Sequence, residues 1–148
     1  MSADSRHTQT VREGRDAEEI AAAQDLRVRV FCDEQGVSRE EELDEFEDSA
    51  IHVVALDETG VVATCRLREV EAGLKLERMA VERRLRGLGA GARLLTEAER
   101  LARERGANRM ILHAQTRAEG FYGGQGYEAE GERFDEAGIE HVRMAKAL

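Results

Sequence analysis

The chain has 148 residues, 41% of them hydrophobic, and a formal net charge of −9 at pH 7. This length suits one domain with a single core, which we place at residues 10–148 after a flexible tail at residues 1–9. The negative charge argues against a nucleic-acid partner, because proteins bind nucleic acids mainly through lysine and arginine. No apolar run approaches the roughly 18 residues that span a bilayer, and residues 1–15 lack the apolar core of a signal peptide. We expect a cytoplasmic protein with no membrane partner.

The first third of the chain predicts a strand, a helix and an acidic loop. Val11-Arg12 is expected to form a short strand, and Asp16 is expected to cap a helix that ends before Gly36. Residues 40–48 are mostly acidic. Two interpretations of this run are open: a solvated surface face, or a loop beside a binding site that attracts a cationic substrate.

Alternation of apolar and polar residues then predicts three consecutive antiparallel strands, at residues 51–56, 61–68 and 74–81. In the third strand, strict alternation places Glu77 on the same face as Met79 and Val81.

The second half predicts a long helix, a strand, a short helix and a hairpin. Apolar residues recur at helical spacing up to the stop signal at Gly106, and a short buried strand at residues 110–112 follows. A right-handed crossover makes this strand parallel to the one before the helix. A short helix at residues 116–122 and strands at 127–134 and 138–144 complete the chain. The result is an α/β (α+β) fold: a mixed, mostly antiparallel sheet of about six to seven strands, with a parallel central pair and flanking helices.

A glycine-rich segment, Arg86-Gly87-Leu88-Gly89-Ala90-Gly91, lies between the third strand and the long helix. Glycine permits positive φ, and a helix start offers unpaired amides and the positive end of the dipole, so this segment could bind phosphate or simply form a tight turn. The dinucleotide fingerprint fits less well, because residues 82–86 separate strand and glycines and the next strand ends in His113-Ala114-Gln115 rather than in an acidic residue. The P-loop sequence Gly-Lys-Ser/Thr is absent.

Two motifs resemble the GNAT N-acetyltransferase superfamily. Arg86, Gly89 and Gly91 match its acyl-CoA loop, Arg/Gln-x-x-Gly-x-Gly/Ala, and residues 121–127 resemble its Phe-Tyr-x-x-x-Gly-Phe/Tyr element one strand and one helix later. Residues 30–37, followed by the acidic run and His52, also resemble the ElaA-like branch of the superfamily. The resemblance spans nearly the whole chain and implies the GNAT fold.

The resemblance further implies acetyl-CoA as co-substrate and transfer of its acetyl group to a primary amine by direct attack in a ternary complex. Backbone groups of the strand before the glycines would hold pantetheine, and the amides of the glycine loop would hold the pyrophosphate. The residues expected to bind the cofactor are Met79, Ala80, Val81, Arg86, Gly87, Leu88, Gly89, Ala90, Gly91, Ala92, Gln115 and Phe121. Gln115 stands near a position where many members of the superfamily have asparagine.

Tyr122 occupies the position of the superfamily's general acid, although a buried tyrosine can also serve only in core packing. Gly123 and Gly124 stand where relatives usually have helix-forming residues. Each glycine costs about 1 kcal/mol inside a helix, so we consider an early end of the helix, which would displace the Tyr122 hydroxyl.

Glu77 is the candidate general base, and an ion pair with Lys75 explains it equally well. Glu34 is a further candidate. We interpret the three histidines near the predicted strands as structural, with His113 the first to test; the other two are His52 and His141.

Metal ligation and disulfides are not expected, because Cys32 and Cys65 lack the required number and spacing; we expect two free thiols, mostly buried. The resemblance implies an amine acceptor, which we expect to be a small molecule or a peptide, and the acidic run would favour a cation. A homodimer is compatible with the sequence. Two other functions remain open: a CoA-binding regulatory module without catalysis, and a phosphate-binding domain unrelated to CoA.

Overall fold

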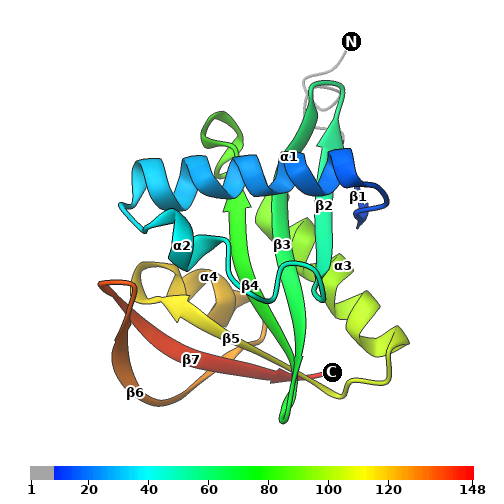
Figure 1. The fold of residues 1–148 in the computed structure, drawn as a ribbon. Helices are drawn as coiled ribbons and strands as arrows, with labels where there is room; N and C mark the ends of the chain where they lie inside the picture. The colour runs from blue at the N-terminus through cyan, green and yellow to red at the C-terminus, as the bar shows by residue number, and fades with distance from the viewer. Residues whose placement is uncertain (1–8) are drawn as a thin grey trace.

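The computed structural model describes residues 9–148 and contains one seven-stranded sheet (Figure 1). The strands lie in the order β1-β2-β3-β4-β5-β7-β6, and among neighbours only β4 and β5 run parallel. The strands are β1 (Thr10–Glu13), β2 (Ile51–Asp57), β3 (Gly60–Val70), β4 (Gly73–Val81), β5 (Arg109–Gln115), β6 (Glu128–Glu136) and β7 (Ile139–Ala147). The predicted mixed sheet is confirmed, whereas the predicted tail lies, apart from Gln9, outside the described residues.

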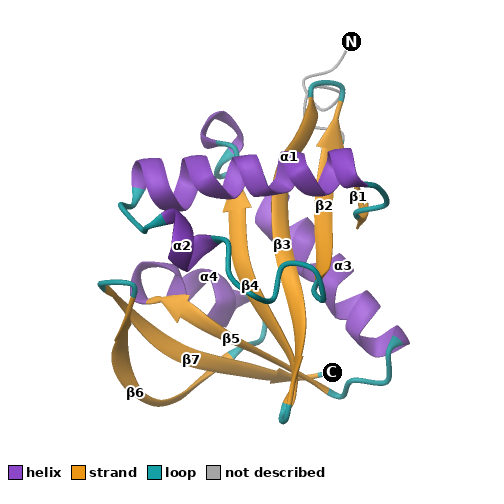
Figure 2. Ribbon diagram, in the orientation of Figure 1, coloured by secondary structure: helices purple, strands orange, loops and turns teal. Residues whose placement is uncertain are grey.

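Helices cover both faces of the sheet, with α1 crossing one face of β2–β4 and α3 the other (Figure 2). The helices are α1 (Ala17–Arg27), α2 (Arg39–Glu42), α3 (Ala90–Glu104) and α4 (Glu119–Gly124). Helix α1 continues as a π-helical segment, Val28–Glu34. The predicted cap is confirmed, since the Asp16 carboxylate accepts a hydrogen bond from the Glu19 amide at 2.9 Å. Within residues 9–148, no helix has the length and apolar character that crossing a bilayer requires.

The main core fills the space between α3 and the sheet. Leu94 and Leu95 of α3 are buried there against Leu74 and Leu76 of β4, and the opposite face carries a smaller cluster in which Leu26 and Val30 pack on Ala80. Burial of apolar surface on both faces fixes the sheet between two layers of helix.

Strands β4 and β5 pair over only three residue pairs, from Leu74 opposite Met110 to Leu76 opposite Leu112, and then separate (Figure 1). Just beyond this point β4 contains a β-bulge, at Arg78, whose φ is 58°. A positive φ is unfavourable for arginine, and the extra residue at a bulge reverses the alternation of side chains.

The bulge decides which side chains of β4 share a face. Glu77 pairs with Arg66 on the α1 side of the sheet, whereas Met79 and Val81 pack against the core under α3. The expectation that Glu77 shares a face with Met79 and Val81 is therefore wrong, because strict alternation does not hold across a bulge.

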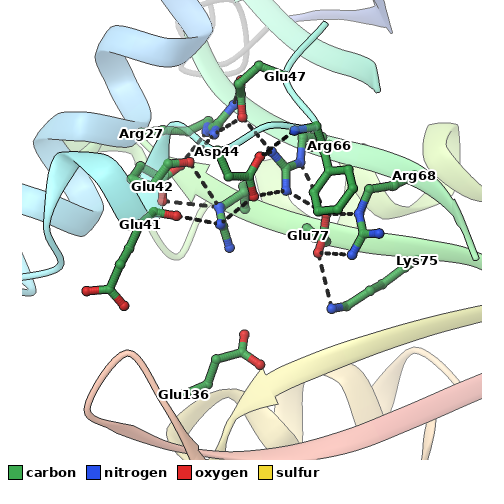
Figure 3. Close-up of polar contacts among 12 residues, drawn as sticks. Arg27, Glu41, Glu42, Asp44, Glu47, Arg66, Arg68, Lys75, Glu77 and Glu136 are labelled. Atoms are coloured by element: carbon green, nitrogen blue, oxygen red, sulfur yellow. Dashed lines mark hydrogen bonds and ion pairs between the residues drawn. The ribbon is translucent and has the colours of Figure 1, made fainter. Parts of the chain in front are cut away.

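Two buried arginines bind the acidic run (Figure 3). The guanidinium of Arg27 donates to Glu42 at 2.6 Å and to Glu47 at 2.7 Å. Arg66 donates to Glu47, to Asp44 at 2.7 Å and to Glu77 at 2.7 Å. Both arginine side chains are 0% exposed, so these ion pairs form away from water.

The acidic run is consequently not a solvated face along its whole length. Glu42, Asp44 and Glu47 turn inward onto arginines that are distant in sequence, and only the remaining acidic side chains are exposed. Part of the run also forms helix α2, capped by Ser38, where we expected a loop. The cations that stabilise this arrangement lie on α1, β3 and β4, which is why the local sequence did not show it.

Glu77 accepts hydrogen bonds from both Arg66 and Arg68 and pairs with Lys75. Burial alone would raise the pKa of Glu77, but hydrogen bonds from Arg68 and Arg66 and the charge of Lys75 outweigh burial and lower it to about 2. The carboxylate therefore holds its charge throughout the neutral range.

We expect Arg66→Ala to lower the free energy of unfolding by about 3–5 kcal/mol, because it leaves buried carboxylates short of a cation. Arg100→Ala is the matched control, since Arg100 pairs with Glu97 and Glu104 on the exposed side of α3 and should change stability little. Urea unfolding followed by circular dichroism measures both. Equal losses in the two variants would contradict a special contribution from the buried network.

We also expect the charge of Glu77 to contribute stability that is complete above pH 4.5 and lost as the pH falls toward 2, because folding lowers its pKa from 4.5 to about 2. The difference in unfolding free energy between wild type and Glu77→Gln should therefore shrink across that range. Urea unfolding at successive pH values tests this, with Glu104→Gln as an exposed control. A difference that does not change with pH would show that the charge contributes nothing.

Candidate active site

A cavity of about 480 Å³ lies where β4 and β5 separate. Met79 and Tyr122 line it from the α3 side of the sheet, and Glu77 and His113 line it from the α1 side. The cavity thus reaches both faces through the gap between the two strands, and its volume is in the range of small-ligand sites. Among residues 9–148, no three His, Cys, Asp or Glu side chains are grouped so as to hold a metal ion.

The glycine loop offers unpaired amides at the start of α3. Gly87 and Gly89 have φ values of 79° and 90°, which favour glycine, and Gly89 caps the helix. Within the described chain nothing accepts a hydrogen bond from the amides of residues 89–92; the first helical donor is Arg93, which bonds the Gly89 carbonyl at 3.1 Å. These donors and the helix dipole together make an anion site.

Three residues that the sequence singled out meet beside this loop. A Cβ atom at Gly91 would lie 3.3 Å from Cζ of Phe121 and 3.6 Å from Sδ of Met79, so a larger residue would have to displace the Phe121 ring by a few tenths of an ångström. Phe121 is 39% exposed there, a high value for a large apolar side chain. Because Met79 and Phe121 both line the cavity, the loop and the cavity adjoin beside Gly91.

Tyr122 is buried at the cavity, and its hydroxyl contacts Sδ of Met79 at 3.6 Å. Burial raises the pKa of Tyr122 above its ordinary value, so the phenol keeps its proton at neutral pH. Helix α4 continues through Gly123 and Gly124, so the early end that we considered does not occur. The two cysteines are free, as expected, and burial raises the pKa of Cys65 to about 12.

Other predicted cofactor residues have partners within the protein. The guanidinium of Arg86 donates to the Glu34 carboxylate at 2.9 and 3.0 Å and to the Val81 carbonyl at 3.0 Å. Gln115 donates to Gln35 at 2.8 Å at the cavity wall. Ala80 faces α1 in the smaller cluster, so only its backbone is available to a ligand.

The candidate bases differ in their surroundings. The low pKa of Glu77 counts against it as a proton acceptor, because a carboxylate that holds its charge so firmly takes up a proton only in acid. All three histidines have the hydrogen bonds that we expected of structural residues: His52 to the Glu47 carbonyl, His141 to the Ile139 carbonyl and His113 to the Glu136 carboxylate. Sequence reasoning did not identify Glu136, which reaches the site only through the register of β6, β7 and β5.

Comparison with known proteins agrees with this geometry. The family model described as "Acetyltransferase (GNAT) domain" matches residues 17–148. YjcF of Bacillus subtilis (strain 168), an uncharacterized N-acetyltransferase, is 38% identical over 130 residues, which are 87% of this chain and 93% of YjcF.

Two solved structures share the fold. An acyl-CoA N-acyltransferase from Pseudomonas aeruginosa is 26% identical with a TM-score of 0.82, covering 95% of this chain and 99% of that one. Escherichia coli ElaA is 21% identical with a TM-score of 0.81, covering 94% and 98%, so the predicted likeness to ElaA is confirmed in the fold. Because the family model covers most of the sequence and the fold agrees, the chain belongs to the GNAT acetyltransferase family.

Proposed function

We propose that the protein transfers an acetyl group from acetyl-CoA to a primary amine by direct attack in a ternary complex. The observation that carries this proposal is the contact between the unpaired amides of the glycine loop and a cavity that crosses the sheet beside Tyr122. The likeness to YjcF and to the Pseudomonas aeruginosa acyl-CoA N-acyltransferase supports the same reaction.

The donor would bind along the α3 side of the gap. Its pyrophosphate suits the amides of residues 87–92, where donors and helix dipole coincide. Its pantetheine suits the edge of β4 at residues 79–81, which lies beyond the last pair with β5 and so leaves backbone groups on that edge without a strand partner. One such amide would polarise the thioester carbonyl, a contribution of about 3–4 kcal/mol for a single donor.

Tyr122 would protonate the departing thiolate. Its phenol is protonated at neutral pH, and its hydroxyl lies at the cavity beside Sδ of Met79, where the thiolate would leave the tetrahedral intermediate. The acetyl carbon thereby exchanges its C–S bond for a C–N bond, and CoA leaves as the thiol. In this mechanism Arg86 and Glu77 stabilise the walls of the site and do not contact the reacting atoms.

The acceptor would enter from the α1 side, between α2 and the β6–β7 hairpin. Glu41 lines the cavity on α2 and has no ion pair with any residue between 9 and 148, and Glu136 lines it on the hairpin (Figure 3). Carboxylates on two walls favour a cationic amine, of a small molecule or of a peptide, by electrostatic attraction.

We expect Gly89→Val to lower the affinity for acetyl-CoA at least about tenfold, because the side chain strains a residue at φ 90° and its Cβ would lie 3.2 Å from Nη1 of Arg93. Gly106→Val is the control, since Gly106 has φ 80° at the far end of α3 with nothing within 4 Å. Calorimetry with acetyl-CoA and with simple nucleotides measures both variants. Equal heats for both ligands would favour a general phosphate-binding domain.

We expect Tyr122→Phe to lower kcat by roughly 10²–10⁴-fold while acetyl-CoA affinity stays nearly unchanged, because only the proton of the phenol is removed. The assay is thiol release from acetyl-CoA in a screen of amines that includes polyamines. Tyr127→Phe is the control, because its hydroxyl donates to Glu99 at 2.9 Å inside the core. A wild-type protein that binds acetyl-CoA but releases no thiol with any amine would be a regulatory module instead.

A further inference from the structure

His113 is the first residue of β5 beyond its pairing with β4. Its neighbours Leu112 and Ala114 are buried in the core under α3, so the His113 side chain lies on the opposite face, where it lines the cavity. Tyr122 lines the same cavity from the α3 side. A proton donor and an imidazole therefore border the gap from its two faces.

The ring of His113 is held in one orientation. Nδ1 lies 2.8 Å from Oε2 of Glu136, and the ring of Phe134 meets the imidazole edge-to-face with centroids 5.0 Å apart. The hydrogen bond from His113 lowers the pKa of Glu136, despite partial burial, so that carboxylate is ionised and can only accept. We assign the proton of the neutral ring to Nδ1, which leaves the lone pair on Nε2.

The Nε2 atom is free to take a proton. It has no hydrogen-bond partner among residues 9–148. The buried side-chain atoms that lack a partner in that range are His52 Nδ1 and Arg93 Nε, so Nε2 of His113 is not a buried atom. No other candidate base combines these features. Cations surround Glu77, and Arg86 is bound to Glu34. His52 is 4% exposed, and His141 is 7% exposed and bonded to a carbonyl instead of a carboxylate.

We propose that His113, oriented by Glu136, accepts a proton from the ammonium group of the acceptor; this inference rests on the proposed acetyl transfer. The ammonium gives one proton to Nε2, and the neutral amine then attacks the thioester carbonyl. The amine loses its second proton after attack, and this proton replaces the one that Tyr122 gives to the thiolate. The proton on His113 passes to water, so one amide, one thiol and one free proton result.

Charged and titratable groups of several elements surround His113. Glu136 on β6 is in direct contact, and Arg143 is the residue paired with His113 on β7. The other such groups that line the cavity are Glu41 and Glu42 on α2, Lys75, Glu77 and Arg78 on β4, Arg117 before α4, and His141 on β7. The dyad of His113 and Glu136 thus has one anion in direct contact and charges of both signs further off.

The test compares His113→Gln with His52→Gln, a control histidine on the same face of the sheet that does not line the cavity. We expect His113→Gln to lower kcat/KM for a basic amine by roughly 10²–10⁴-fold and to remove the acidic limb of the pH profile, with acetyl-CoA affinity by calorimetry unchanged. His52→Gln should keep both rate and limb. Glu136→Gln, which removes a positioning residue, should lower the rate less than His113→Gln does, because the ring keeps Nε2 but loses the carboxylate that orients it.

A weakly basic acceptor gives a second readout. Its amine is already neutral at the assay pH and needs no proton acceptor, so His113→Gln should lose far less activity with it than with the basic amine. A purely structural role for His113 predicts the same loss with both acceptors, and that result, or an unchanged acidic limb, overturns the inference.

The outcomes separate the two proposals. Thiol release by the wild type together with an unaffected His113→Gln defeats only the role of His113. Acetyl-CoA binding without thiol release from any amine defeats acetyl transfer and, with it, this role. If His113→Gln does not fold by circular dichroism, Glu136→Gln decides instead, and an equal loss of rate with the basic and the weakly basic acceptor then counts against the dyad.

Discussion

The short pairing between β4 and β5 is the constraint on which the rest of the site depends. After three residue pairs the two strands part, and the bulge at Arg78 turns β4 away while it still pairs with β3. A continuous sheet would bury the backbone of residues 79–81 in a ladder and close the passage between the two faces. The cavity exists because β4 separates from β5 while it remains paired with β3.

The buried ion pairs hold the α1 side of that cavity in shape. Removing Arg27 and Arg66 from water is costly, and the cost is offset only because each guanidinium meets several carboxylates with short hydrogen bonds. The same contacts tie the acidic run and α2 to β3, next to the bulge. Side chains of β4 that would be candidates for chemistry in isolation, Glu77 above all, are thereby held in ion pairs.

Sequence reasoning succeeded where the signal is local. Glycines at positive φ, a helix start and the Phe121-Tyr122 motif are each read from neighbouring residues, and the structure brings the glycine loop and Phe121 into contact. The bulge at Arg78 has no such signal, because arginine disfavours that conformation and only the surrounding sheet imposes it. The contact between His113 and Glu136 joins residues 23 apart in sequence through the register of three strands. Contacts of that kind follow from tertiary packing, which periodicity does not encode.

A passage that is open on both faces of the sheet also has a kinetic consequence. If CoA approaches from the α3 side and the amine from the side of α2 and the hairpin, neither molecule blocks the route of the other. The acetylated product would then leave by the way the amine came, whether or not the spent thiol is still in place. Such a route imposes no steric order on arrival or departure, so the affinities alone would determine the sequence of events in each turnover.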